Sequence, residues 1–239
     1  MAFKMTTLLN RDFINKKLTW IAYVPDKWDV PRGNYFQLDL KMCQLTALKY
    51  NFNWHDDRAP VPRIAQTVDQ PSKILHVDVS VNDLIILDFD ALMPFRHLRS
   101  LDASLNRIDT LGLEVCTHLR FLNLAHNFIR KIEGISGCVQ LYEVHFSMNQ
   151  IERITNMPTL DFLTILYLDH NQLDSLNGIQ ALLNLQELYI QKNRLVSTPS
   201  LSTKFLMALG NIPRYFSFSR YNLLSGFQAG ILKIVFLPF

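Results

Sequence analysis

Six copies of one eleven-residue frame dominate this sequence. The frame, L-x-x-L-x-L-x-x-N-x-I, is clearest at residues 119–129, and it begins again at residues 74, 98, 141, 163 and 185. Its four aliphatic positions are apolar in every copy, which has a chance of roughly 10⁻⁷ at a hydrophobic content of 49% if positions were independent. The frame therefore predicts an array of stacked repeats rather than a fold with one central core.

The frame asparagine recurs at a nearly constant interval. Its successive spacings are 24, 21, 22, 22 and 22 residues. The amide follows a short strand, where the chain must turn and backbone groups need new hydrogen-bond partners. We therefore predict a structural role in the turns for Asn82, Asn106, Asn127, Asn149, Asn171 and Asn193.

Alternation within the frame predicts which side chains face the interior. Alternate residues of a strand point to the same side, so Leu122 and Leu124 are expected to face inward and Asn123 outward. A single repeat cannot bury its own apolar face, whereas stacked neighbours bury a continuous core. Cys116 and Cys138 occupy equivalent places before two copies of the frame, and we expect both to be core residues.

The frame divides the chain into three parts. Residues 74–202 are expected to form the array of six repeats, preceded by an N-terminal segment at 1–73. Residues 35–48 fit the frame with cysteine in place of asparagine, which predicts either an outlying seventh repeat or an N-terminal capping strand pair, followed by a loop at 49–73. The frame then fails, so the aromatic-rich tail at 203–239 is either a cap or a non-native end.

These repeats resemble the leucine-rich-repeat superfamily, specifically its short class of about 22 residues per repeat. That class is similar to the regulatory subunit of protein phosphatase 1 and to ciliary, tubulin-associated and spliceosomal repeat proteins. The resemblance implies an α/β solenoid, a leucine-rich-repeat horseshoe with a parallel β-sheet on the concave face and short 3₁₀, helical or irregular turns on the convex face. It also implies a protein partner on the concave face, without naming that partner.

The composition limits the other classes of function. With 24 Lys and Arg against 21 Asp and Glu, the net charge of +3 is too small to indicate nucleic acid or a membrane by itself. The apolar tail is interrupted by Gln228, Lys233 and Pro238, whereas a membrane-spanning helix needs about 20 apolar residues. The N-terminal apolar stretch is too short for a signal peptide and no N-glycosylation sequon occurs, so we expect a cytoplasmic protein, with the nucleus or cilium as alternatives.

Sequence patterns for catalysis and metal binding are missing. No nucleophile elbow, dinucleotide-binding, phosphate-binding or zinc-protease motif occurs, so we expect no enzyme activity and no cofactor. His126, His145 and His170 fall on neighbouring repeats, and a zinc ion would need their nitrogens at ~2.0–2.1 Å from one point. We therefore predict no catalytic residue and no metal site.

Outward positions of the later repeats favour a protein-binding surface. The third, fifth and eighth frame positions are expected to form columns across the strands. Aromatic side chains beside polar groups are typical of protein interfaces, and carboxylates there would suit a partner that carries Arg or Lys. The predicted protein-binding residues are Phe121, Glu143, His145, Ile165, Tyr167, Asp169, His170, Glu187 and Tyr189.

The sequence as a whole predicts an intracellular protein-binding scaffold or regulatory subunit, with phosphatase regulation and the cilium as settings implied by the resemblance. The alternative is an RNA-associated repeat protein of the spliceosomal type. That alternative depends on the mild basic excess, with Arg130, Lys131 and Arg153 near the strand ends. The sequence makes no prediction of oligomeric state.

Overall fold

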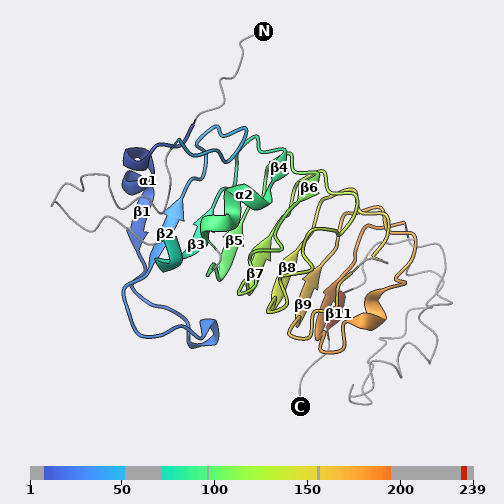
Figure 1. The fold of residues 1–239 in the computed structure, drawn as a ribbon. Coiled ribbons are helices and arrows are strands. Elements are labelled where there is room, and N and C mark those ends of the chain that lie inside the picture. The colour runs from blue at the N-terminus through green and yellow to red at the C-terminus, as the bar shows by residue number, and fades with distance from the viewer. Residues whose placement is uncertain (1–7, 52–70, 96, 155–156, 195–232, 236–239) are drawn as a thin grey trace, which may run out of the picture.

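The computed structural model of the chain describes residues 8–51, 71–95, 97–154, 157–194 and 233–235. Within these ranges the chain forms one solenoid in which successive repeats lie side by side (Figure 1). Most of the predicted loop at 49–73 and most of the tail at 203–239 lie outside the described residues.

One sheet runs along the solenoid. Among the described residues its order is β1-β2-β3-β5-β7-β8-β9-β10-β11, so each repeat adds its strand beside that of the repeat before it (Figure 1). From β2 to β10 the strands are parallel and the frame positions are in register, as where Leu122 lies opposite both Leu101 and Val144. The strands of this sheet are β1 (Leu18–Trp20), β2 (Phe36–Asp39), β3 (Ile74–Asp78), β5 (Ser100–Asp102), β7 (Phe121–Asn123), β8 (Glu143–His145), β9 (Ile165–Tyr167), β10 (Glu187–Tyr189) and β11 (Lys233–Val235).

The connecting segments hold a second short pairing and brief helical turns. Strands β4 (Ile86–Leu87) and β6 (Thr110–Leu111) pair in parallel, and a bridge between Lys131 and Arg153 occupies the same place in later repeats. The helical elements are α1 (Arg11–Lys17), η1 (Asp26–Trp28), η2 (Pro71–Lys73), α2 (Phe89–Leu92), η3 (Met93–Phe95) and η4 (Ile179–Ala181). The predicted fold class is confirmed: a leucine-rich-repeat solenoid with a parallel sheet on one face and short turns on the other.

The core is continuous along the solenoid. Leu122, Leu124, Phe146 and Leu168 are each fully buried, which confirms the predicted inward positions. Strands β5, β7, β8, β9 and β10 cover the third to fifth frame positions, and β3 begins at the first. Leu124 nevertheless continues the ladder, because its N–H donates to the carbonyl of His145 at 2.8 Å.

The frame asparagines link successive turns through their amides. Asn127 accepts a hydrogen bond from the N–H of Ile108 at 2.9 Å and donates from Nδ2 to the carbonyls of Ala103 at 3.0 Å and Leu124 at 3.1 Å. Ile108 and Ala103 belong to the preceding repeat, whereas Leu124 belongs to the same one. Each amide therefore holds its own turn to the turn before it. Matching bonds are made by Asn82, Asn106, Asn149, Asn171 and Asn193.

Residues 35–48 continue the array at its N-terminal end. β2 lies parallel to β3 with Leu38 opposite Val77, and Asn82 donates to the carbonyl of Leu40 at 2.9 Å. β1 then pairs antiparallel with β2. This end therefore combines a strand in the repeat frame with an antiparallel strand beyond it. At the opposite end β11 pairs antiparallel with β10, which places Lys233 opposite Tyr189 in the register.

The prediction that the eighth frame position belongs to the strands is wrong. Residues at this position have φ between 53° and 58°, in the left-handed region. The chain bends at this position and the following asparagine is directed inward, and a single left-handed residue accomplishes this. His170, which we predicted to be a binding residue, therefore lies in a turn. The residues concerned are Val81, Leu105, His126, Met148, His170 and Lys192.

Of the three free thiols, Cys43 alone is expected to react quickly with a thiol reagent in the native protein. Cys116 and Cys138 are fully buried, as predicted, and burial raises the pKa of Cys116 to about 12 and raises that of Cys138 as well. The thiolate is the reactive form, so a raised pKa suppresses labelling at neutral pH. Colorimetric thiol titration is expected to count one thiol in the native protein and three after denaturation. Rapid labelling of a second native thiol would contradict the buried assignments.

Candidate functional site

The strand face consists of the third and fifth frame positions of seven repeats, including the one at 35–48. Folding of the repeats does not require apolar side chains at these positions, because the core is filled from the first, fourth and sixth. All are half-buried except Ser100, which is buried, and Asp39, which is exposed. The third-position residues are Gln37, His76, Ser100, Phe121, Glu143, Ile165 and Glu187. The fifth-position residues are Asp39, Asp78, Asp102, Asn123, His145, Tyr167 and Tyr189.

Four rings on neighbouring strands form a ladder, here called the ring ladder: Phe121, His145, Tyr167 and Tyr189. His145 and Tyr167 stack with their centroids 4.1 Å apart and their planes at 17°, and Tyr167 stacks on Tyr189 at 4.2 Å and 11°. Phe121 lies against His145 at 5.4 Å with a tilt of 56°. The parallel register produces the stacking of His145, Tyr167 and Tyr189, because it places these equivalent fifth-position residues about 4.8 Å apart. Phe121 belongs to the third position and reaches His145 diagonally.

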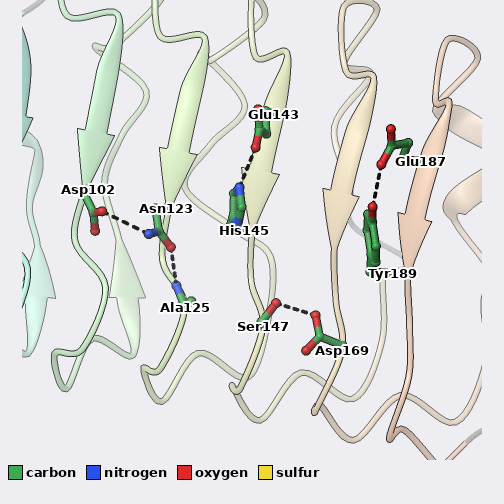
Figure 2. A network of polar contacts seen from close by, with 9 residues as sticks. All are labelled: Asp102, Asn123, Ala125, Glu143, His145, Ser147, Asp169, Glu187 and Tyr189. Carbon is green, nitrogen blue, oxygen red and sulfur yellow. Dashed lines mark hydrogen bonds and ion pairs between the residues drawn. The ribbon is translucent and has the colours of Figure 1, made fainter. Parts of the chain in front are cut away.

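Two carboxylates lie beside the ring ladder and hold its polar atoms. Glu143 Oε1 lies 2.8 Å from His145 Nε2, and the hydroxyl of Tyr189 donates to Glu187 Oε2 at 2.6 Å (Figure 2). Ile165 lies between the two glutamates, opposite Glu143 on one side and Glu187 on the other. The site therefore presents an apolar side chain with a carboxylate on each flank.

The two tyrosines of the ring ladder stay neutral at physiological pH. Burial raises the pKa of Tyr167 to about 12, and the neighbouring Tyr189 and the glutamates contribute in the same direction. The hydrogen bond to Glu187 raises the pKa of Tyr189, with burial as a second cause. The phenols therefore act as hydrogen-bonding groups, and the glutamates carry the negative charge of this half of the strand face.

The N-terminal half of the strand face carries three aspartates in register, Asp39, Asp78 and Asp102. Their carboxylates accept bonds from backbone N–H groups two residues later, as Asp78 does from Ser80 at 2.8 Å. Asp102 also accepts from Asn123 Nδ2 at 3.0 Å (Figure 2). These bonds give a structural reason for aspartate at this position, because an aspartate at the end of a strand can cap the turn that follows.

A neutral histidine accompanies these aspartates. His76 lies in the next column, and its Nδ1 is 2.8 Å from the hydroxyl of Ser100. Burial lowers the pKa of His76, an effect larger than the opposing influence of Asp78, Asp102 and Asp39. The imidazole therefore does not offset the negative charge of the aspartates at neutral pH.

The charge of the strand face is opposite in sign to that of the chain. The fourteen positions of the strand face hold five carboxylates and no Lys or Arg, while the whole sequence has a net charge of +3. The basic residues that motivated the RNA alternative, Arg130, Lys131 and Arg153, are exposed on the connecting segments after the asparagine turns. The strand face is therefore acidic, and these cations lie outside it.

A hollow of about 340 Å³ lies at the rim of the strand face, where the N-terminal segment contacts the repeats. Arg99 fixes this contact, because its Nε donates to the carbonyl of Trp28 at 2.7 Å and its Nη1 to that of His97 at 2.8 Å. Among the described residues the Nε of Arg120 is buried without a hydrogen-bond partner. The lining residues are Pro25, Trp28, Ser100, Arg120, Phe121, Tyr142 and Glu143.

Seven of the nine predicted binding residues come together on the strand face. The two others lie beyond the ends of the strands: His170 is in a turn, and Asp169 accepts a bond from the hydroxyl of Ser147 at 2.5 Å (Figure 2). Sequence reasoning missed Trp28, Arg120 and Tyr142 at the rim. The alignment of Arg99 and Arg120 at the second frame position was the one signal that could have indicated the rim.

In the part of the chain that the structure describes, no group of three or more His, Cys, Asp or Glu side chains is arranged to hold a metal ion. None of the helices within the described ranges has both the length and the apolar character that crossing a bilayer requires.

Comparison with known proteins agrees with the fold. No family model matches the chain. The human leucine-rich repeat-containing protein 49 is 35% identical in an alignment of 108 positions, and the match covers 38% of this chain and 16% of that protein. An internalin from Listeria monocytogenes superposes with a TM-score of 0.51 at 21% identity, covering 58% of this chain and 39% of the internalin. The TLR13–ssRNA13 complex gives a TM-score of 0.49 at 24% identity over 51% of this chain and 18% of that one. The similarity to the human repeat protein and to the internalin supports the leucine-rich-repeat fold. The chain spans a minor share of each of these proteins.

Proposed function

We propose that this leucine-rich-repeat chain is a protein-binding scaffold that holds its partner on the strand face. The observation that carries the proposal is the ring ladder, which places Phe121, His145, Tyr167 and Tyr189 half-buried at positions that the core does not use. Half-buried aromatic side chains next to hydrogen-bonding groups are enriched at the centres of protein interfaces. The parallel sheet fixes their spacing, so the binding surface is preformed and little order has to be gained on binding.

The acidic strand face favours a protein over RNA as the partner. Nucleic-acid binding depends on Lys and Arg that neutralise phosphates. The strand face offers Glu143, Glu187 and three aspartates instead. We therefore propose a non-catalytic role in which the chain recruits or regulates another protein. We further propose a reducing compartment such as the cytoplasm, in line with three cysteines that are all free.

Removal of the two tyrosine rings is expected to release the partner. In affinity purification, Tyr167→Ala/Tyr189→Ala should recover at least about tenfold less partner protein than wild type, because truncating an aromatic hot spot of an interface costs about 2 kcal/mol or more. The matched control is Phe128→Ala/Phe162→Ala, which removes two rings that are 49% and 61% exposed outside the strand face. The proposal fails if both variants remain folded and recover the same proteins in the same amounts as wild type.

A further inference from the structure

We infer that the partner presents an extended segment bearing arginine or lysine, with one cationic side chain seated on Ile165 between Glu143 and Glu187. This inference rests on the proposed function and specifies the chemistry of the partner. We call the three residues the cation seat. The segment crosses the strands along the solenoid, so that further basic residues reach the aspartates of the N-terminal half.

The cation seat has the shape that a long basic side chain requires. Ile165 is half-buried and directly opposite both glutamates in the sheet register. With neighbouring strands ~4.8 Å apart, the glutamate Cα atoms are separated by roughly 10 Å. Arg and Lys bury their aliphatic stems on apolar surface and keep the charged end at a polar edge. The isoleucine would contact the stem and either carboxylate would meet the charge.

Bonds within the strand face hold the two carboxylates in place. Glu143 is fixed by His145 at 2.8 Å, and Glu187 by the hydroxyl of Tyr189 at 2.6 Å. A carboxylate accepts several hydrogen bonds, so these contacts orient the group without excluding a further donor. Because the glutamates are already oriented by their neighbours, less side-chain entropy is lost when a cation binds. The guanidinium of Arg, with five donors in a planar fork, suits such acceptors better than the ammonium of Lys.

The N-terminal half of the strand face also attracts positive charge. Apart from the two glutamates, Asp102 on β5 and Asp78 on β3 are the acidic residues of the strand face nearest to the cation seat in strand order, and neutral His76 does not offset their charge. They lie three or four strands from Ile165, which is about 14–19 Å at ~4.8 Å per strand. An extended chain rises ~3.3 Å per residue, so the matching basic residues should be about four to six positions apart.

Peptide titration of the whole 239-residue chain tests this inference. The probe, called the spaced peptide, is a short Gly/Ser peptide with two arginines five positions apart. One comparison peptide carries the two arginines at adjacent positions. The other carries two glutamates in place of the arginines of the spaced peptide. In NMR spectra of protein with methyl-labelled isoleucine, the Ile165 methyl signal should shift when the spaced peptide is added. It should not shift when the glutamate peptide is added. The spaced peptide should bind at least about threefold more tightly than the adjacent one, since only it reaches both acidic regions.

Charge-neutral variants localise the effect. Glu143→Gln/Glu187→Gln should weaken binding of the spaced peptide by about tenfold, as loss of close charge pairs does at interfaces. Glu114→Gln/Glu152→Gln removes the same charge from exposed residues outside the strand face and should change binding by less than about twofold. Thermal unfolding checks that both variants keep the fold.

Three results would overturn the inference. They are an unshifted Ile165 methyl at saturating spaced peptide, equal binding by both arginine peptides, and equal weakening by the two glutamine variants. If any of these occurs while Tyr167→Ala/Tyr189→Ala still loses its partner in affinity purification, the scaffold function stands and the basic partner is wrong. If the tyrosine variant keeps its partner, the proposed function itself fails, whatever the peptides do.

Discussion

Leu122→Asp is expected to abolish the folded array. Leu122 is fully buried in β7, opposite Leu101 and Val144 of the two neighbouring repeats. A carboxylate at this point has no cationic partner among its register neighbours, and burying an ion without one costs several kcal/mol. Because whole domains are stable by only about 5–15 kcal/mol, this one change removes most or all of that margin. The damage extends in both directions, since each repeat is stabilised by the repeats on either side.

Urea unfolding followed by circular dichroism measures this effect. Leu122→Met is the matched control, because it keeps the apolar volume and should cost less than about 1.5 kcal/mol. Leu166→Asp, at the same frame position in β9, should behave like Leu122→Asp because Leu166 is also fully buried. A stable, cooperatively unfolding Leu122→Asp protein would show that β7 does not face the core.

The inward side chains could be predicted because their periodicity is a direct consequence of strand geometry. Leu124, Phe146 and Leu168 share one frame position, and all three are fully buried. The backbone of the turn could not be predicted in the same way. Met148 and Leu105 look like strand residues in the sequence pattern, but they have left-handed φ values because the chain bends there before the buried asparagine. Hydrophobic alternation reports which side of a strand is buried and contains no information on where the strand ends.

The alignment of residues on the strand face could be predicted, because it follows from the register of the repeats alone. Glu143, Ile165 and Glu187 share a frame position, so their alignment follows from the repeat, and the structure adds the bonds to His145 and Tyr189. The rim hollow has no such origin. Trp28 contacts Arg99 across 71 residues of sequence, through a segment that does not follow the frame. In such a contact only the periodic partner leaves a sequence pattern, here Arg99 and Arg120 at the second frame position, and the non-periodic partner Trp28 leaves none.

Asn127→Ala is expected to destabilise the protein by about 3 kcal/mol, at the upper end of the range for unsatisfied buried groups. Asn127 is 5% exposed, and alanine would leave the N–H of Ile108 and the carbonyls of Ala103 and Leu124 without this partner in the turn. Water reaches such a site poorly, so the lost bonds are not replaced. The free energy of unfolding from urea titration measures the loss.

Two companion variants separate hydrogen bonding from cavity formation. Asn127→Asp has nearly the same shape as the native residue, so it leaves no cavity. If cavity formation alone mattered, this variant would keep its stability. It should be as destabilising as alanine, because a carboxylate would face three carbonyl oxygens to which the amide now donates. Asn193→Ala should cost only about 1 kcal/mol, since Asn193 is half-buried and water can replace part of its bonding. Equal costs at Asn127 and Asn193, or a well-tolerated aspartate at 127, would show that the ladder of amides does not hold the turns together.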